Sequence, residues 1–362
     1  LDALVALRLV QGFAGGLLLV AGQTLLFLAY PRRWQPVVQA LFAIGAVVTP
    51  ATLAPALQGW LVDNQSWRWI FFGNALTALA ACGLLLMTGD RAGLPRPGPA
   101  CDFPGLVLLS ASLAGLSYLC IQGNRWNWFS EAGIVWLTLA AILAFAAFVA
   151  QQALGRGRFL FDPGVFGSQD FSFAFLVSFV AGAALFGSAY LIPSFAVSVL
   201  GFTPTAAGQL LLPSAGPFAL ALLLAAVLIQ MRRVPPFATV PFGILLIMAA
   251  MWMLSGSTSQ SGADQMMPAI LARGLGLGLL FLSIQLIAFW DLPDRLLASG
   301  IALFNIGRQL GGLIGVAGLQ TLISHGVATN RTVLGSHVAS GDPDVAGQVA
   351  KMTAMLVGKG LD

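Results

Sequence analysis

The sequence predicts an all-α integral membrane protein, a polytopic helical bundle, on the strength of three observations. Charged residues make up only 8% of the 362-residue chain, against roughly 25% in soluble domains. Hydrophobic residues make up 58%, and the mean hydropathy is +0.89. The apolar residues also gather into runs of roughly 20 residues, the length that crosses a bilayer. A soluble enzyme of one or two domains is therefore excluded.

Ten apolar runs have the required length. They lie at residues 3–30, 35–61, 69–87, 105–122, 132–152, 171–199, 205–230, 237–256, 266–289 and 298–325. The strands of a membrane barrel are not a competing interpretation, because the runs are too long and lack a two-residue alternation. We therefore expect ten transmembrane helices.

The basic residues indicate how these spans are oriented, because cytoplasmic loops retain Lys and Arg. The connections after odd-numbered spans hold nine such residues, and those after even-numbered spans hold two, Arg68 and Arg125. The first loop is thus expected inside, and Leu1 and Asp362 are both expected on the outer side. The net charge of +4 is scattered without a basic stripe or tail, so nucleic acid is not an expected partner.

The chain contains an internal duplication. Residues 11–45 align without a gap with residues 273–307, and 13 of the 35 positions are identical. The matches include the proline and the arginine of the connecting loop, which a shared apolar composition does not explain. Both copies run outside to inside and then return, which predicts two parallel pseudo-repeats related by an axis along the membrane normal. Transporters whose halves rock around a midplane site have this arrangement.

Five short motifs carry a resemblance to a known family. They are Arg8-Leu9-Val10-Gln11-Gly12, Ala54-Pro55-Ala56-Leu57-Gln58-Gly59, Trp67-Arg68-Trp69-Ile70-Phe71-Phe72-x-Asn74, Leu200-Gly201-Phe202-Thr203-Pro204 through Leu212-Pro213, and Asn305-x-x-Arg308-Gln309-Leu310-Gly311-Gly312. Together they resemble the major facilitator superfamily, specifically its fourteen-helix drug:proton antiporter branch of the EmrB/QacA type. The resemblance implies that the chain begins at the family's fourth helix and stops before its last.

The resemblance also implies a domain organisation. Residues 1–87 would be the remaining three spans of the N-terminal half, and residues 88–152 a helix pair inserted between the halves. Residues 153–325 would be the five spans of the C-terminal half, and residues 326–362 an outer polar segment before the missing last helix.

The function implied by the resemblance is secondary active transport, the proton-coupled export of amphipathic or cationic drugs across a bacterial inner membrane by alternating access. The expected partners are the lipid bilayer, a small-molecule substrate and protons, with a periplasmic adaptor and an outer-membrane channel where the organism has two membranes. One alternative is a proton-coupled exporter of a specific metabolite, peptide or siderophore. Another is a non-transporting sensor or assembly protein on the same fold.

Arg8, Gln11 and Gly12 form the first of these motifs, to which the resemblance assigns proton coupling. A cation near a carboxylate favours its ionised form, and weakening that contact lets the proton return. None of the 13 acidic residues lies well inside a predicted span. The resemblance therefore places the carboxylate on the missing first helix. The alternative is that Arg8 snorkels to the interface or forms a structural ion pair.

Buried polar side chains are the other candidates for function, because a charge at the bilayer centre costs roughly 2.5 to 3.5 kcal/mol. Arg273, like Arg8, lies five to seven residues from an outer span end, where snorkelling can satisfy it. Arg308 lies about 15 Å deep and needs polar partners. With Asn305 one turn earlier, it either stabilises helix packing or lines a substrate cavity.

Two repeat-related amides, Gln23 and Gln285, are further candidates for the cavity. An amide facing lipid is costly unless it is hydrogen-bonded. The alternative is that they only bond neighbouring helices.

Two sets of small or kinking residues suggest close packing. Helix contacts are expected at Gly16, Gly274, Gly278, Gly311, Gly312 and Gly315, because small residues let backbones approach. The second set is the antiporter motif, Pro50, Ala54, Pro55, Gln58 and Gly59, which the resemblance identifies as a gate that limits leak. The alternative for this segment is a simple bend.

No other chemistry is predicted. The three cysteines lack metal-ligand spacing, and His325 and His337 have no neighbouring cysteine or acid. No catalytic constellation at one membrane depth is visible, so the sequence predicts neither an enzyme nor a cofactor.

Overall fold

The structure is a computed structural model that describes residues 2–66, 68–88, 102–126, 128–154, 160–231, 233–337 and 347. Within these ranges every regular element is a helix, as the composition predicted. The chain divides into two compact units, residues 1–316 and residues 317–362. Residue 67 of the third motif, and residues 338–346 and 348–362 of the expected outer segment, lie outside the described residues.

The helices follow the predicted runs closely. The first span is α1 (Asp2–Ala29). The second consists of four consecutive elements, η1 (Arg32–Trp34), α2 (Gln35–Ala43), η2 (Ile44–Leu53) and α3 (Ala54–Asn64). The third and fourth spans are α4 (Arg68–Thr88) and α5 (Phe103–Gln122). The others are α6 (Ala132–Leu154), α7 (Gln169–Ser198), α8 (Pro204–Gln209) with η6 (Leu212–Ser214) and α9 (Ala215–Gln230), α10 (Pro236–Ser255), α11 (Ala263–Phe289) and α12 (Asp294–His337).

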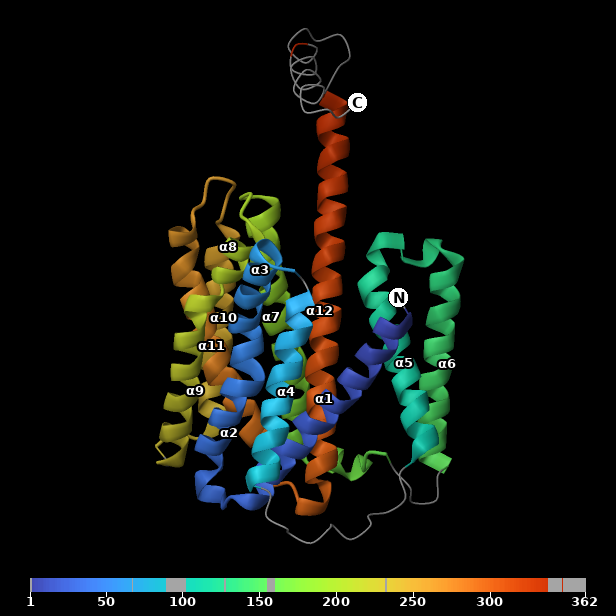
Figure 1. The fold of residues 1–362 in the computed structure, drawn as a ribbon, viewed down its shortest axis with the longest axis vertical. Coiled ribbons are helices and arrows are strands. Elements are labelled where there is room, and N and C mark those ends of the chain that lie inside the picture. The colour runs from blue at the N-terminus through green and yellow to red at the C-terminus, as the bar shows by residue number, and fades with distance from the viewer. Residues whose placement is uncertain are drawn as a thin grey trace. The chain divides into compact units, whose positions relative to one another are not determined.

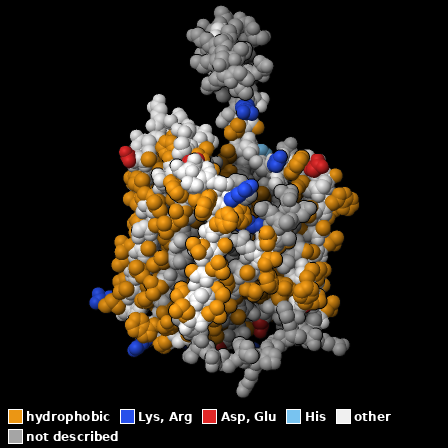
Figure 2. Space-filling view, viewed as in Figure 1, with side chains coloured by type: hydrophobic (Ala, Val, Ile, Leu, Met, Phe, Trp, Pro, Cys, Tyr) orange, Lys and Arg blue, Asp and Glu red, His pale blue; other side chains and the backbone are white. Residues whose placement is uncertain are grey.

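Nine of these spans are long and apolar enough to cross a membrane, by length and composition within the described residues. The remaining predicted span, residues 69–87, is present as α4, whose apolar segment Arg68–Leu84 is shorter. Figure 2 shows that the visible face of the molecule is covered mainly by hydrophobic side chains and carries few charged ones. The chain is thus a multi-pass membrane protein.

Two spans that the sequence predicts as continuous are interrupted at prolines. Pro50 lies inside the π-helical segment η2, where the wider turn accommodates a residue that has no N–H and crowds the preceding turn. Pro213 lies in η6, the short 3-10 turn that separates α8 from α9. These irregular turns place the two prolines where ordinary helical hydrogen bonding is already broken.

The core of the first unit surrounds α11. Nearly every residue of α11 from Ile270 onward is partly or fully buried, and this helix packs on α7, α9 and α10. By contrast, α5 and α6 pack mainly on each other, and Figure 1 shows them side by side as a hairpin.

The last described helix is longer than expected. The sequence predicts that the tenth span ends at His325, whereas α12 continues to His337. This boundary prediction was wrong because the polar residues after His325 end the apolar run without ending the helix, which continues through Gly326 and meets no proline before His337. Residues 294–316 of α12 belong to the first unit, and the part from Ala317 is the described helix of the second.

Candidate functional site

The centre of the candidate site is a pair of polar side chains on α12. Arg308 and Asn305 are each 5% exposed, and they lie one turn apart. Arg308 Nη2 donates a hydrogen bond of 2.5 Å to Asn305 Oδ1, while Asn305 Nδ2 donates to the carbonyl of Ile301 at 2.9 Å. Asn305 therefore holds the guanidinium against its own helix.

A chain of amides continues from this pair into the N-terminal helices. Asn305 Nδ2 also donates to Gln23 Oε1 of α1 at 3.3 Å. Gln23 Nε2 lies 3.4 Å from Gln39 Oε1 of α2, and Gln39 Nε2 lies 3.3 Å from Gln35 Oε1. We call Arg308, Asn305, Gln23, Gln39 and Gln35 the polar ladder; it joins the two repeat-related segments through buried hydrogen bonds.

The Gln35 end of the ladder satisfies backbone carbonyls. Gln35 Nε2 donates to the carbonyls of Leu26, Phe27 and Tyr30, at 3.3, 2.9 and 2.7 Å. These carbonyls lie at the C-terminal end of α1, where helical partners are missing. Sequence reasoning missed Gln35 and Gln39, although their four-residue spacing within an apolar run places them on one helix face.

The repeat mate of Gln23 has a different environment. Gln285 of α11 is 2% exposed, and its Oε1 atom has no hydrogen-bond partner among the described residues. A buried amide oxygen without a partner is costly, which makes it suited to accept a bond from a bound molecule.

The guanidinium of Arg308 is only partly satisfied. Its carbon atom lies 5.6 Å from the centroid of the Phe281 ring on α11, within the range of a cation–π contact. Its Nη1 atom has no hydrogen-bond partner in the described part of the chain. A free donor and a positive charge thus remain at the buried end of the ladder.

Arg273 corrects a sequence prediction. Instead of snorkelling to the interface, its side chain is fully buried in α11. Arg273 Nε donates to Ser188 Oγ at 2.6 Å, and Nη2 donates to the carbonyl of Leu185 at 3.2 Å. The prediction was wrong because α7 packs on this face of α11 and supplies polar partners within the bundle. Like Arg308, Arg273 has an Nη1 atom without a partner among the described residues.

Arg8 lies apart from the polar ladder. Its Nη1 atom donates to Gln11 Oε1 at 3.1 Å, and its guanidinium carbon lies 4.4 Å from the Phe71 ring centroid of α4. Both Arg8 and Gln11 are exposed. A Cβ atom built at Gly12 meets no described atom within 4 Å, so this face of α1 is open.

The segment of the antiporter motif packs against α8. A Cβ atom at Gly59 of α3 would lie 2.5 Å from the carbonyl oxygen of Pro204 in α8. The reciprocal contact places Gly208 of α8 against the carbonyl of Pro55. Ala54 and Pro55 are partly buried, whereas Pro50 and Gln58 are exposed.

A hydrogen-bonded carboxylate reinforces this contact. Asp63, at the end of α3, accepts bonds from the backbone N–H and the Oγ1 hydroxyl of Thr205, at 2.9 and 2.5 Å. Thr205 lies in the first turn of α8, where N–H groups have no helical partner and favour an anion. We call Gly59, Asp63, Thr205 and Gly208 the α3–α8 clasp.

The other glycines differ between the two repeats. In α11, Gly274 lies against the carbonyl of Ser214, and Gly278 against that of Phe218. In α12, Gly311, Gly312 and Gly315 lie against Phe179, Phe186 and Ala183 of α7. Gly16 departs from the predicted packing role, because no described atom lies within 4 Å of a Cβ atom there. The glycine pattern is repeated in sequence, but the contacts are described only for the second copy.

These features define a polytopic helical membrane protein with a polar, positively charged interior between two repeated segments. The chain belongs to the Major Facilitator Superfamily, whose family model matches residues 1–316.

Curated relatives cover most of the chain. It is 27% identical to the colistin resistance protein EmrB of Acinetobacter baumannii, over 88% of this chain and 61% of that protein. It is 26% identical to the multidrug export protein EmrB of Escherichia coli, over 98% and 69%, and 25% identical to the fatty acid resistance protein FarB of Neisseria gonorrhoeae, over 93% and 66%. The chain thus spans about three fifths to two thirds of the length of these relatives.

Proposed function

We propose that the protein is a secondary active transporter that exports amphipathic or cationic organic compounds, drugs among them, in exchange for protons by alternating access. Membership of the superfamily and the export and resistance names of the relatives support a transporter over an enzyme. The observation that carries the proposal is the polar ladder, which sets a buried guanidinium at the contact between the repeated segments.

In this proposal the substrate cavity is lined by Gln23, Gln285, Asn305 and Arg308. Three of them share the ladder, and the fourth offers an unpartnered carbonyl oxygen. Substrate binding would compete for the Gln23–Asn305 bond, whose two ends lie on different halves. Breaking that bond is a direct way for a bound molecule to change how strongly the halves hold together.

Proton coupling is proposed to involve Arg8, Gln11 and Gly12. The Arg8 guanidinium is exposed beside Phe71, so a carboxylate of the full-length protein can approach it. Such a carboxylate would hold its proton less tightly beside the cation and regain it when the helices move apart.

The α3–α8 clasp is proposed to be the gate that the antiporter motif provides. In the topology that places Leu1 outside, the clasp closes the outer end of the path between the two halves. These halves are residues 1–87 and residues 153–325. The inserted pair, residues 88–152, would lie between them in sequence, and residues 326–362 would form an outer polar segment. A periplasmic adaptor and an outer-membrane channel would then meet the outer face of this inner-membrane protein.

A second candidate is the export of one specific metabolite that carries a negative charge or a carboxyl group. Two buried guanidiniums, Arg273 and Arg308, each keep one Nη1 atom without a partner among the described residues. Positive charge in the interior of the bundle favours anions over cations. The relative named for fatty acid resistance is in accord with this candidate.

The deciding experiment measures efflux by the full-length protein in proteoliposomes with an imposed proton gradient. Arg308→Gln is expected to lower efflux at least tenfold, because a charged hydrogen bond contributes about 1.5 to 3 kcal/mol. Arg295→Gln is the matched control, since Arg295 lies exposed on the same helix. A dye competed by many unrelated drugs supports multidrug export, and a dye competed only by one acid supports the second candidate. Gradient-independent efflux, or unchanged efflux in Arg308→Gln, contradicts the proposal.

A further inference from the structure

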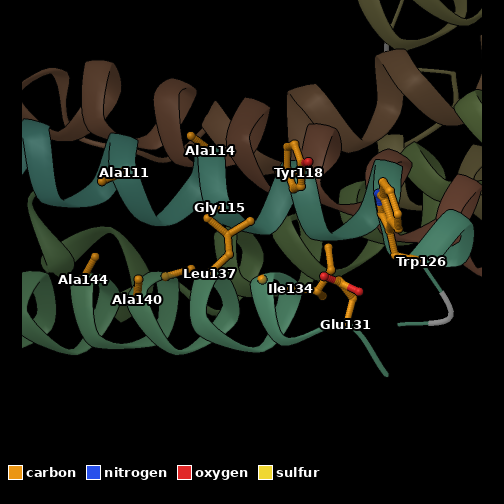
Figure 3. Close-up of a pocket in the computed structure, with 12 residues that line it drawn as sticks. Ala111, Ala114, Gly115, Tyr118, Trp126, Glu131, Ile134, Leu137, Ala140 and Ala144 are labelled. Carbon is orange, nitrogen blue, oxygen red and sulfur yellow. The ribbon is translucent and has the colours of Figure 1, made fainter. Parts of the chain in front are cut away.

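A groove lies along the α5/α6 hairpin, away from the polar ladder. It has a volume of about 740 Å3, within the range of ligand sites in proteins. Its floor is formed by small side chains of both helices, namely Ala111, Ala114, Gly115, Ala140, Ala141 and Ala144. Figure 3 shows Ala111, Ala114 and Gly115 on one of the two facing helices and Ala140 and Ala144 on the other. Ile134 and Leu137 of α6 also line the groove, so small residues supply most but not all of its apolar wall.

Two contacts between α5 and α6 hold the hairpin in shape. Near its middle, a Cβ atom at Gly115 would lie 2.7 Å from Cβ of Ala141, so the helices are in close contact there. At the end remote from the turn, Asp102 accepts hydrogen bonds from Nε2 of Gln151 and Nε2 of Gln152, each at 2.7 Å. The groove is therefore a preformed feature of the two helices.

The end of the groove near the turn is polar and aromatic. Glu131, Tyr118 and Trp126 line it there, and all three are exposed. Arg125 stacks on Trp126, with its guanidinium carbon 5.6 Å from the ring centroid. Aromatic rings beside charges are typical of the headgroup level of a bilayer. This end of the groove thus has an acidic side chain, Glu131, in its lining, and a basic one, Arg125, over the ring of another lining residue, Trp126.

Helices outside the hairpin contribute no lining residue to the groove in the described structure. Among the described elements, α5 and α6 pack substantially only on each other and on the short turns between them, η3 (Asn124–Trp126) and η4 (Trp128–Ser130). A lipid fits these features, because its apolar tail matches the apolar part of the groove and a headgroup with one positive and one negative group matches the charged end.

We propose that this groove binds a phospholipid with a primary ammonium headgroup, phosphatidylethanolamine. An acyl chain lies on the alanine and glycine floor, the ammonium group donates to the Glu131 carboxylate, and the phosphate faces Arg125. Phosphatidylcholine lacks an N–H donor for Glu131, and phosphatidylglycerol carries no cation. The headgroup therefore decides the preference, and the acyl chain supplies contact common to all three lipids. This site is independent of the proposed transport function.

Native mass spectrometry of the purified full-length protein tests the proposal, with the three lipids supplied at equal concentration and with identical acyl chains. The wild type is expected to retain phosphatidylethanolamine most strongly. Glu131→Gln is expected to reduce its preference over phosphatidylcholine about tenfold, since a charged hydrogen bond is lost. Asp264→Asn is the matched control, because Asp264 is an exposed acid in the first turn of α11.

A second pair of variants tests the floor of the groove. Ala144→Leu fills it and is expected to lower retention of all three lipids, whereas Ala146→Leu, on an exposed face of α6 outside the groove, is expected to leave retention unchanged. Equal retention of the three lipids by the wild type overturns the proposal, as does an unchanged preference in Glu131→Gln. Photocrosslinking from position 140 to a protein helix in place of lipid overturns it as well.

Discussion

Phe27 and Phe289, which occupy the same position in the two sequence repeats, contact each other. Their ring centroids lie 5.4 Å apart, and the rings meet edge to face at an angle of 80°. Residues related by a two-fold axis touch their own mates only close to that axis. The contact is therefore what two parallel repeats predict, and it lies at the ends of α1 and α11 that precede the Pro-x-Arg loops.

This contact predicts that cysteines at both positions can be joined. In the double variant Phe27→Cys, Phe289→Cys, we expect a short bifunctional thiol reagent to crosslink the two helices and to stop proton-driven efflux. Peptide mapping detects the crosslink, and efflux assays detect the block. Each single variant, treated in the same way, serves as the control and retains its own efflux. Efficient crosslinking with full efflux would show that the halves do not separate at this end.

Gln285, whose Oε1 atom has no hydrogen-bond partner among the described residues, allows an effect on stability to be distinguished from an effect on substrate binding. Replacing a buried acceptor that has no partner costs little, so Gln285→Leu is expected to change thermal unfolding by less than about 1 kcal/mol. Gln23→Leu removes one partner of Asn305 and is expected to cost about 1 to 3 kcal/mol. Thermal unfolding in detergent measures both. If Gln285 lines the cavity, its variant loses substrate affinity while it keeps its stability; equal affinity would remove Gln285 from the cavity.

The α3–α8 clasp predicts a leak. Asp63→Ala removes both bonds between α3 and the first turn of α8, whereas Thr205→Ala removes only the hydroxyl bond, because the backbone N–H of residue 205 still donates to Asp63. Each variant is expected to cost about 0.5 to 2 kcal/mol, as for loss of a helix cap. We expect faster passive proton uptake in proteoliposomes without substrate. Asp170→Ala, at an exposed position in the first turn of α7, is the control. The double variant should leak no more than Asp63→Ala alone, because that variant already removes both bonds.

The contact between α7 and α12 predicts sharp differences between glycines. Gly311 lies directly against the backbone of Phe179, so Gly311→Ala forces the helices apart at a cost of about 1 to 3 kcal/mol. Gly216, near the start of α9, has no described atom within 4 Å of a Cβ atom there, and Gly216→Ala is expected to be neutral or stabilising by up to about 1 kcal/mol. The two unfolding temperatures, measured side by side, test the contact. A stable Gly311→Ala protein would mean that α12 does not approach α7 so closely.

The sequence was sufficient to predict the helical class, nearly all of the spans and the polar residues of the repeat. Span length and apolar composition set these features locally, and the bilayer imposes the length. The partners of Arg273 could not be predicted from the sequence, because Ser188 and Leu185 lie some 85 residues away along the chain. They meet Arg273 only through the packing of α7 on α11. The pairing of Asp63 with Thr205 depends in the same way on contact between α3 and α8.

The breaks in the helices were also hard to predict. Pro50 and Pro213 both lie inside apolar runs, and hydropathy alone gives no reason to divide either run. Whether a proline bends a helix, widens one turn or ends it depends on which neighbouring groups take over the lost hydrogen bond. Gln35 and Gln39 were missed for a related reason: their role appears only when the opposing amide of Gln23 is in place.

The burial of Arg273 has a consequence for biogenesis. A helix that carries this cation pays roughly 2.5 to 3.5 kcal/mol when it enters lipid alone. The groups that relieve the cost, Ser188 Oγ and the carbonyl of Leu185, belong to a helix synthesised earlier. Integration of α11 is thus coupled to the prior presence of α7 beside the translocon, and the order of synthesis supplies that helix in time.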